Sequence, residues 1–238
     1  MSKLISVVVP FYNEEENVAL VAERVAAALD SLEGYDYECL FVNDGSTDAT
    51  REKIESVSAV NPNIRLVQLV KNQGQSAALL AGMRSARGIY ILTIDGDLQN
   101  DPADFPRIIE MLNDVDCVCG YRKKRNDSAV RRVSSRIANT VRRAVLSDGI
   151  RDTGCGTKGF RRECVPHIIP FNGSHRYYAA LLRNAGFSIA ECPVEHHERE
   201  FGVSKYGIGN RLFRGIYDLI GVGWLLRRTV VIEIEEED

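Results

Sequence analysis

The sequence predicts an α/β fold in which a mostly parallel sheet is covered by helices on both faces. Three observations support this prediction. Apolar segments of strand length alternate with segments of helical periodicity, the connections are short, and polar residues gather where the strands end. Because the carboxyl ends of the strands in an open α/β sheet line one crevice, the third observation also predicts where a ligand would bind.

Five strands and the helices between them are expected in the first half of the chain. The expected strands are residues 4–9, 39–42, 64–70, 89–94 and 115–121. Helical periodicity covers residues 14–32, and further helices are expected up to residue 59, up to residue 86 and from Asp101-Pro102 onward. We expect Thr47 to be the N-cap of the second helix.

The composition is that of an ordinary globular protein. The 238 residues are 45% hydrophobic and 26% charged, and the formal net charge of −3 argues against a general nucleic-acid binder. The six cysteines form no Cys-x-x-Cys pair and no signal peptide is recognised, so we expect reduced, buried thiols and a cytoplasmic protein. The longest apolar run near the C-terminus, Leu219 to Leu226, is too short to span a bilayer.

The fourth expected strand runs straight into two carboxylates, Asp95 and Asp97. In an extended chain, side chains two residues apart point the same way, and the intervening Gly96 allows a turn or a close approach to a ligand. Together with Gln99, the two carboxylates suit Mg²⁺ or Mn²⁺, which often complete their coordination with phosphate oxygens. The alternative is a simple Asp-Gly turn at the end of a strand.

Four motifs together resemble the family 2 glycosyltransferases of the GT-A fold. They are Val-Val-Pro-Phe-Tyr-Asn-Glu-Glu (8–15), Val-Asn-Asp-Gly-Ser-Thr-Asp (42–48), Asn-Gln-Gly (72–74) and Asp-Gly-Asp-Leu-Gln (95–99). Within that family the chain is most similar to the dolichyl- or polyprenyl-phosphate sugar transferases, and residues 153–161 and 197–207 fit as well. We expect a GT-A catalytic domain, with a Rossmann-like nucleotide-binding sheet, over residues 1–207, and an amphipathic helix with an acidic tail over residues 208–238.

The resemblance implies an inverting transferase that moves a sugar from a UDP- or GDP-sugar to a polyprenyl phosphate. It implies that Asp97 and Gln99 are metal ligands, with Asp95 close to the ribose, the sugar or the metal. We expect the catalytic residues to be Asp95, Asp97, Arg122 and Asp152. The nucleotide sugar would be held by Pro10, Tyr12, Glu14, Asp44, Lys71, Gly74, Asp95, Arg199 and Lys205.

The residues alone leave three functions open, two of which differ in the acceptor. A basic run from Arg122 to Arg143 suits an acceptor phosphate, bound by Arg122, Arg131, Arg136 and Ser204, although such runs are often solvated faces. A phosphate monoester needs no protein base, whereas a hydroxyl acceptor in cell-envelope polysaccharide synthesis would need one, for which Asp152 and His175 are the candidates. The third alternative is an inactive nucleotide-sugar-binding protein. No GxGxxG motif follows the first strand, which argues against a dinucleotide-binding dehydrogenase.

The segment 209–228 has the pattern of an amphipathic helix. Its apolar stripe consists of Leu212, Phe213, Ile216, Leu219, Ile220 and Trp224. Arginines flank the stripe, which suits a helix lying on the inner face of a membrane. Packing on the protein's own core and pairing of two copies of the chain are the alternatives. Unlike many relatives, the sequence has no transmembrane hairpin after the expected catalytic domain.

Overall fold

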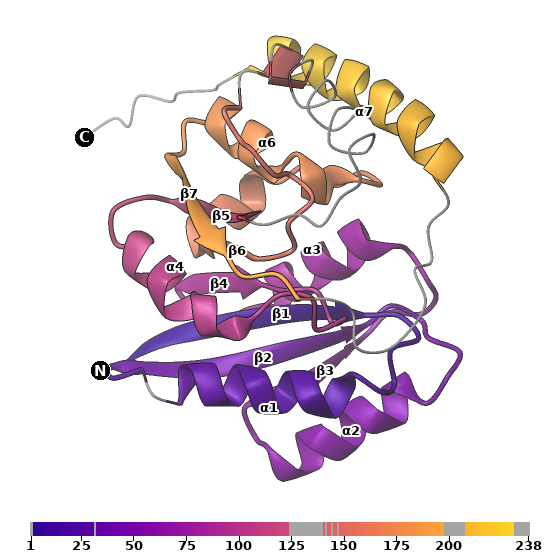
Figure 1. Ribbon diagram of the computed structural model, residues 1–238, viewed down its shortest axis with the longest axis vertical. Coiled ribbons are helices and arrows are strands. Elements are labelled where there is room, and N and C mark those ends of the chain that lie inside the picture. The colour runs from indigo at the N-terminus through magenta and orange to yellow at the C-terminus, as the bar shows by residue number, and fades with distance from the viewer. Residues whose placement is uncertain are drawn as a thin grey trace, which may run out of the picture.

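The computed structural model describes residues 2–30, 32–123, 140, 142–143, 145–146, 148–197 and 208–230, except the side chains of 208–214. Within these residues the chain forms one seven-stranded sheet with helices on both faces (Figure 1). The order across the sheet is β3-β2-β1-β4-β6-β5-β7. The strands are β1 (Lys3–Phe11), β2 (Tyr35–Asn43), β3 (Ile64–Gln68), β4 (Tyr90–Thr93), β5 (Cys117–Arg122), β6 (Lys158–Arg161) and β7 (Ile189–Val194).

The sheet is mostly parallel, as the sequence predicts, with one strand reversed. Strands β1, β2, β3 and β4 pair in parallel, and so do β5 and β7, whereas β6 lies antiparallel between β4 and β5. The reversal matters for the site because it places the start of β6 beside the end of β4, with Lys158 opposite Thr93. Strands β6 and β7 were not expected from the sequence.

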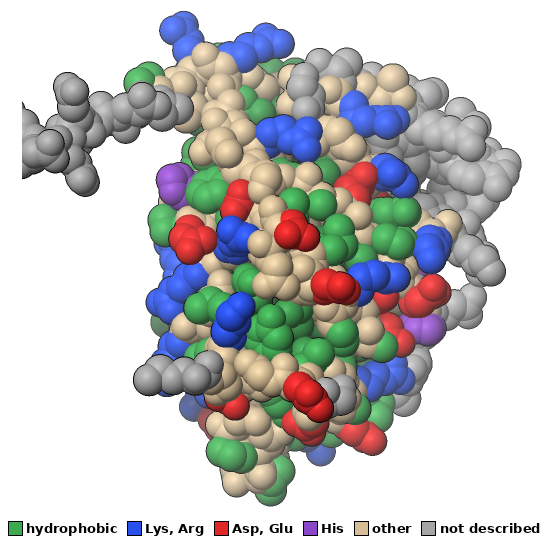
Figure 2. Space-filling view, turned by 90° about the vertical axis from the view of Figure 1, so that its left-hand side faces the viewer, with side chains coloured by type: hydrophobic (Ala, Val, Ile, Leu, Met, Phe, Trp, Pro, Cys, Tyr) green, Lys and Arg blue, Asp and Glu red, His purple; other side chains and the backbone are tan. Residues whose placement is uncertain are grey.

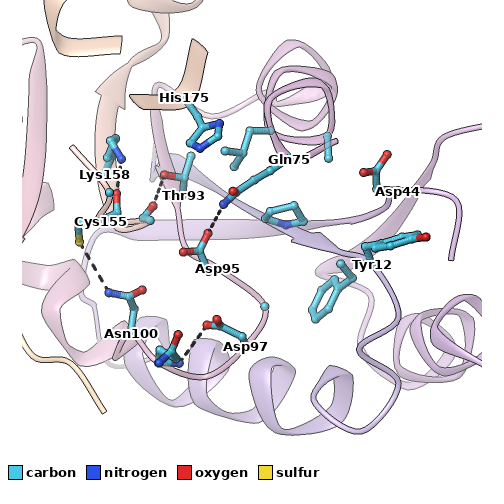
Figure 3. Close-up of a pocket in the computed structure, with 18 of the residues that line it drawn as sticks. Tyr12, Asp44, Gln75, Thr93, Asp95, Asp97, Asn100, Cys155, Lys158 and His175 are labelled. Atoms are coloured by element: carbon cyan, nitrogen blue, oxygen red, sulfur yellow. Dashed lines mark hydrogen bonds between the residues drawn. The ribbon is translucent and has the colours of Figure 1, made fainter. Parts of the chain in front are cut away.

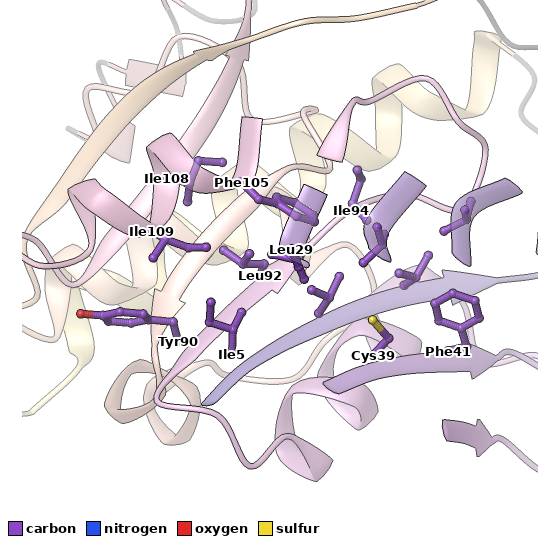
Figure 4. Close-up of a cluster of buried hydrophobic side chains, with 14 of the residues drawn as sticks. Ile5, Leu29, Cys39, Phe41, Tyr90, Leu92, Ile94, Phe105, Ile108 and Ile109 are labelled. Atoms are coloured by element: carbon purple, nitrogen blue, oxygen red, sulfur yellow. The ribbon is translucent and has the colours of Figure 1, made fainter. Parts of the chain in front are cut away.

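Two hydrophobic clusters fill the space between the sheet and the helices. On one face lie α1 (Val18–Leu29), α2 (Thr50–Val60) and α4 (Phe105–Met111), and on the other lie α3 (Gln75–Ser85) and α6 (Tyr178–Asn184). Alternation along β1 serves both clusters, since Val7 and Val9 face the first and Val8 faces the second. Figure 4 shows the first cluster, in which Leu29 of α1 and Phe105 of α4 lie against the strands.

The helix starts show one confirmed prediction and one that is wrong. A 3₁₀ turn, η1 (Pro102–Asp104), leads into α4 with Pro102 at its start, and the Asp101 carboxylate accepts a hydrogen bond from the Ala103 N–H at 2.9 Å. Thr47 is not the N-cap of α2, because that helix begins at Thr50. The Thr47 N–H instead donates to Asn13 Oδ1 at 2.8 Å, and this hydrogen bond joins the loops that follow β2 and β1.

Two further 3₁₀ segments, η2 (Arg162–His167) and η3 (Ser174–Arg176), connect β6 to α6. All six cysteines are buried and unpaired, as expected for reduced thiols. On the face shown in Figure 2, Lys and Arg side chains lie among Asp and Glu side chains, so this face presents no field of a single sign.

The C-terminal helix α7 (Ile208–Arg228) lies over α6 at the top of the molecule in Figure 1. It packs on a third hydrophobic cluster through Val222, with Leu219 and Leu226 beside it. The expected apolar stripe is therefore divided, because Leu219 turns inward while Ile220 and Trp224 stay exposed, Trp224 at 63% of its surface. Among the described residues, no helix is long and apolar enough to cross a membrane.

Candidate active site

A pocket of about 600 Å³ opens at the carboxyl ends of β1, β2 and β4 (Figure 3). Its volume lies in the range usual for small-molecule sites. The residues that line it come from the loops after these strands, from the start of α3, from β5 and β6, and from η3. The strand ends therefore meet at one crevice, as the sequence predicts.

One end of the pocket carries Pro10, Tyr12 and Asp44. The Asp44 carboxylate accepts hydrogen bonds from the N–H groups of Gln73, at 2.8 Å, and Gly74, at 2.9 Å. Burial raises the pKa of Asp44, and these two N–H groups oppose the rise. Asp44 thus holds the loop before α3 in place at the same time as it lines the pocket.

Glycine is required in the turn that carries Asp44. Gly45 has a φ of +66°, and a Cβ there would collide with the backbone of Lys71 and Asn72. The loops after β2 and β3 can therefore approach closely only because residue 45 has no side chain.

The Asp-Gly-Asp segment crosses the middle of the pocket. A Cβ on Gly96 would lie 2.7 Å from the Phe11 ring, so glycine lets this turn pass over the end of β1. Asp95 Oδ1 accepts a hydrogen bond from Gln75 Nε2 at 2.7 Å. Burial, and then the charge of Asp97, raise the pKa of Asp95 to about 6. The positive charges of Lys158 and Arg122 and the Gln75 hydrogen bond limit this rise.

The donor atoms near Asp97 fit a divalent cation. Asp97, Gln99 and His196 all line the pocket, and His196 Nδ1 is buried without a hydrogen-bond partner in the described part of the chain. Burial, and next Arg122, lower the pKa of His196, which favours the neutral imidazole that binds metals. No three His, Cys, Asp or Glu side chains among the described residues form a ready-made metal site. A cation here would therefore need oxygens from a ligand as well.

Arg122, at the end of β5, is held by Asp152. Its Nε–H and Nη2–H donate to the two carboxylate oxygens at 2.6 and 2.9 Å. Both side chains are largely buried, with exposures of 18% for Arg122 and 7% for Asp152. This two-bond geometry fixes the guanidinium on the pocket wall, where Arg122 is a lining residue.

His175, the other candidate base, is bound to α3. Its Nδ1 lies 2.7 Å from Ser76 Oγ, which also accepts a hydrogen bond from the Gly173 N–H at 2.9 Å. Burial, and then the charges of Lys158 and Arg176, lower the pKa of His175 to about 3. A group with this pKa is a poor proton acceptor near neutral pH.

Most of the residues expected at the site line this one pocket. They are Pro10, Tyr12, Glu14, Asp44, Gly74, Asp95, Asp97, Gln99 and Arg122. Lys71 is exposed and does not line it. Arg131, Arg136, Arg199, Ser204 and Lys205 lie outside the described residues.

The sequence analysis gave no role to several lining residues, among them Gln75, Lys158 and His196. Lys158 belongs to a segment, 153–161, that was recognised only by its resemblance. His196 is brought to the site by a bridge to Asn100, a contact between residues far apart in the sequence.

Comparisons with known proteins show what the chain is similar to. A family model described as glycosyl transferase family 2 matches residues 6–169. A curated protein, the dodecaprenyl-phosphate galacturonate synthase of Rhizobium johnstonii, is 40% identical over 229 residues, which are 94% of this chain and 67% of that protein.

Two solved structures show the same fold. One is the glucosyl-3-phosphoglycerate synthase of Mycobacterium tuberculosis with Mn²⁺, UDP-glucose and phosphoglyceric acid, which has a TM-score of 0.66 at 18% identity and covers 94% of this chain and 79% of its own. The other is a mannosyltransferase of Pyrobaculum calidifontis with GDP-mannose and Mn²⁺, with a TM-score of 0.61 at 19% identity over 81% of this chain and 55% of its own. At such identities the likeness shows the GT-A fold alone.

Proposed function

The chain belongs to glycosyl transferase family 2, and from this premise we propose that it transfers a sugar from a nucleoside-diphosphate sugar to a polyprenyl phosphate, with inversion at the anomeric carbon. The name of the 40% identical relative supports a polyprenyl-phosphate acceptor. The pocket supports a nucleotide-sugar donor, because its polar residues come from the strand ends where nucleotides bind in α/β sheets.

The observation that carries the choice of acceptor is the state of the two candidate bases. Both oxygens of Asp152 accept hydrogen bonds from Arg122, and His175 has a pKa of about 3. A hydroxyl acceptor needs a base to take its proton, whereas a phosphate monoester is already anionic near pH 7. An acceptor that brings its own charge fits this site, and we propose that Arg122 binds it.

At the nucleotide end, Tyr12 offers an aromatic face to the base, and Glu14 and Asp44 offer hydrogen-bond acceptors. The donor is a UDP- or a GDP-sugar. Asp97 and Gln99, with Asp95 and His196, would hold Mg²⁺ or Mn²⁺, which when bound neutralises charge on the departing diphosphate.

The transfer needs no proton movement. An oxygen of the acceptor phosphate forms a bond to the anomeric carbon on the face opposite the diphosphate, and the leaving oxygen departs with the electron pair of the broken bond. Arg122 orients the attacking phosphate, and Asp152 orients Arg122. We therefore assign Asp152 a positioning role in place of the expected role as a base.

The direct test uses the purified full chain with Mn²⁺, a panel of nucleotide sugars and a short-chain prenyl phosphate. We expect a glycosyl prenyl phosphate with inverted anomeric configuration. Transfer only to free glycans would favour the hydroxyl-acceptor alternative. Nucleotide-sugar binding with neither transfer nor metal-dependent hydrolysis would favour the inactive binding protein.

We further propose that the protein works peripherally at the inner face of the cell membrane. Ile216, Ile220 and Trp224 form the exposed apolar side of α7, and Arg227 and Arg228 follow it. This combination suits a surface with anionic headgroups. Pairing of two copies of the chain through the same side of α7 is the alternative.

A further inference from the structure

The pocket-lining residue Gln75 has no role in the function proposed above. It is the first residue of α3, and its side-chain Nε2–H donates to Asp95 Oδ1 at 2.7 Å. Figure 3 shows this hydrogen bond crossing from the start of α3 to the segment after β4. Among the described residues, Gln75 is the one hydrogen-bond donor to the Asp95 carboxylate. The other oxygen, Oδ2, is therefore left for a ligand.

The Asp95 carboxylate is also confined by the backbone of residue 156. A Cβ on Gly156 would lie 2.2 Å from Asp95 Oδ2, so the carboxylate packs directly against this glycine. The Thr93 hydroxyl holds the glycine in place by donating to its carbonyl at 2.8 Å. With Gln75 bound to Oδ1 and Gly156 packed nearer to Oδ2, the carboxylate has little freedom to rotate.

The start of α3, which carries Gln75, is itself held in place by Asp44. The Asp44 carboxylate accepts hydrogen bonds from the N–H groups of Gln73 and Gly74, the two residues that precede the helix. Gly74 has a φ of +88°, a backbone conformation that favours glycine, and it turns the chain into α3. The Gln75 amide therefore extends from an anchored point and can support its acceptor.

From this geometry we propose that Gln75 is a positioning residue, which holds the Asp95 carboxylate toward the cation and the diphosphate of the donor. This inference rests on the proposed function, in which Asp95 and Asp97 help to hold the cation, and it adds a residue to that site. The two carboxylates repel each other before a cation binds, so Asp95 needs a support to keep facing the cation site. A hydrogen bond to a ligating carboxylate supplies such a support.

The first test measures binding, so that its result does not depend on sugar transfer. Calorimetry on the purified full chain gives the Kd of UDP and of GDP in the presence of Mn²⁺. For the nucleotide that binds more tightly, Gln75→Met should raise Kd by about 10- to 100-fold, because methionine keeps the length of the side chain and removes the donor. Gln75→Glu should raise it at least as much, since it places a second negative charge against Asp95.

The matched control is Gln68→Met. Gln68 Oε1 accepts a hydrogen bond from Asn43 Nδ2 at 2.9 Å, so this variant also loses a side-chain hydrogen bond, but Gln68 does not line the pocket. Its Kd for the nucleotide should change by less than about threefold.

A double-mutant cycle shows whether Gln75 acts through Asp95. In the Asp95→Ala background, Gln75→Met should change Kd by less than about twofold, because the group that it positions is already absent. Losses that multiply would show that Gln75 contacts the nucleotide or the cation itself, and would overturn the inference.

Kinetics separate positioning from a general loss of structure. In Gln75→Met the KM of the donor should rise while the KM of the prenyl phosphate stays constant, and an equal rise of both would contradict the inference. If Gln75→Met does not fold, Gln75→Glu, which keeps the size and polarity of the side chain, decides the question. Nucleotide binding that is unchanged in the folded variants would overturn the inference and leave the proposed function intact. No binding of either nucleotide to the unchanged protein would refute the proposed function itself.

Discussion

The pair formed by Arg122 and Asp152 allows a sharp test of how the acceptor is bound. In Asp152→Asn the side chain keeps its shape but loses its charge and one of its two acceptor oxygens. Hydrogen bonds to charged groups are worth about 1.5–3 kcal/mol each, and little solvent reaches this pair to replace the lost one. Asparagine can still accept from one N–H, so we expect the interaction that positions Arg122 to weaken by about 2–3 kcal/mol.

This loss corresponds to a roughly 30- to 150-fold fall in kcat/KM for the prenyl phosphate. The KM of the donor should stay nearly constant, because Asp152 acts through Arg122. The assay is steady-state transfer with each substrate varied in turn. Asp148→Asn is the matched control, because Asp148 forms an even more deeply buried pair with Arg142 away from the pocket lining. It should lower the melting temperature without raising the KM of the acceptor.

A double-mutant cycle decides between positioning and base catalysis. If Asp152 works through Arg122, then Arg122→Ala with Asp152→Asn should be no worse than Arg122→Ala alone. Losses that multiply would show that Asp152 acts on its own, as a general base would, and would refute the positioning role. A loss of donor binding equal to that of acceptor binding in Arg122→Ala would place the arginine on the nucleotide diphosphate.

Three further predictions follow from the same site and from α7. Asp97→Ala should abolish turnover with an unchanged melting temperature, and full activity in the variant or in excess EDTA would contradict the metal role. The pKa of Asp95 is raised to about 6, so its carboxylate is protonated below that pH. Mn²⁺ binding to the free protein, measured by calorimetry, should therefore weaken as pH falls from 7 to 5, with a smaller dependence in Asp95→Asn; an equal slope in both would refute this. Anionic liposomes should bind the protein at low salt, less at high salt and less in Trp224→Glu, and an absence of binding at low salt would count against the membrane role.

The position of the pocket could be predicted from the sequence because it follows from a regular feature. Parallel strands end at one edge, and polar residues follow the first four expected strands. Strands β6 and β7 do not show this regular pattern in the sequence. The four residues of β6 include Lys158, Gly159 and Arg161, and their extended state depends on pairing with β4 and β5. Strand formation of this kind depends on neighbours in space more than on local sequence.

The roles of individual side chains were harder to predict where a partner lies far along the chain. Asp152 is a carboxylate and so a candidate base, but its hydrogen bonds from Arg122 can be seen only in the folded structure. The same holds for Thr47, whose N–H donates a hydrogen bond to Asn13 in another loop. The split of the apolar stripe on α7 arises within the helix itself. Adjacent helical residues point about 100° apart, so Leu219 packs on the third cluster while Ile220 stays exposed.

The ion pair between Arg176 and Asp218 gives α7 a direct mechanical link to the pocket. Arg176 lines the pocket, and its Nη2–H donates to the Asp218 carboxylate of α7 at 2.8 Å. A chain shortened at residue 207 would lose Asp218 and would leave a guanidinium on the pocket wall without its counter-charge. A boundary drawn at residue 207 in the sequence would therefore separate Asp218 from the pocket residue that it pairs with. A movement of α7, such as one caused by its docking on a flat surface, would therefore change the position of Arg176 in the pocket wall.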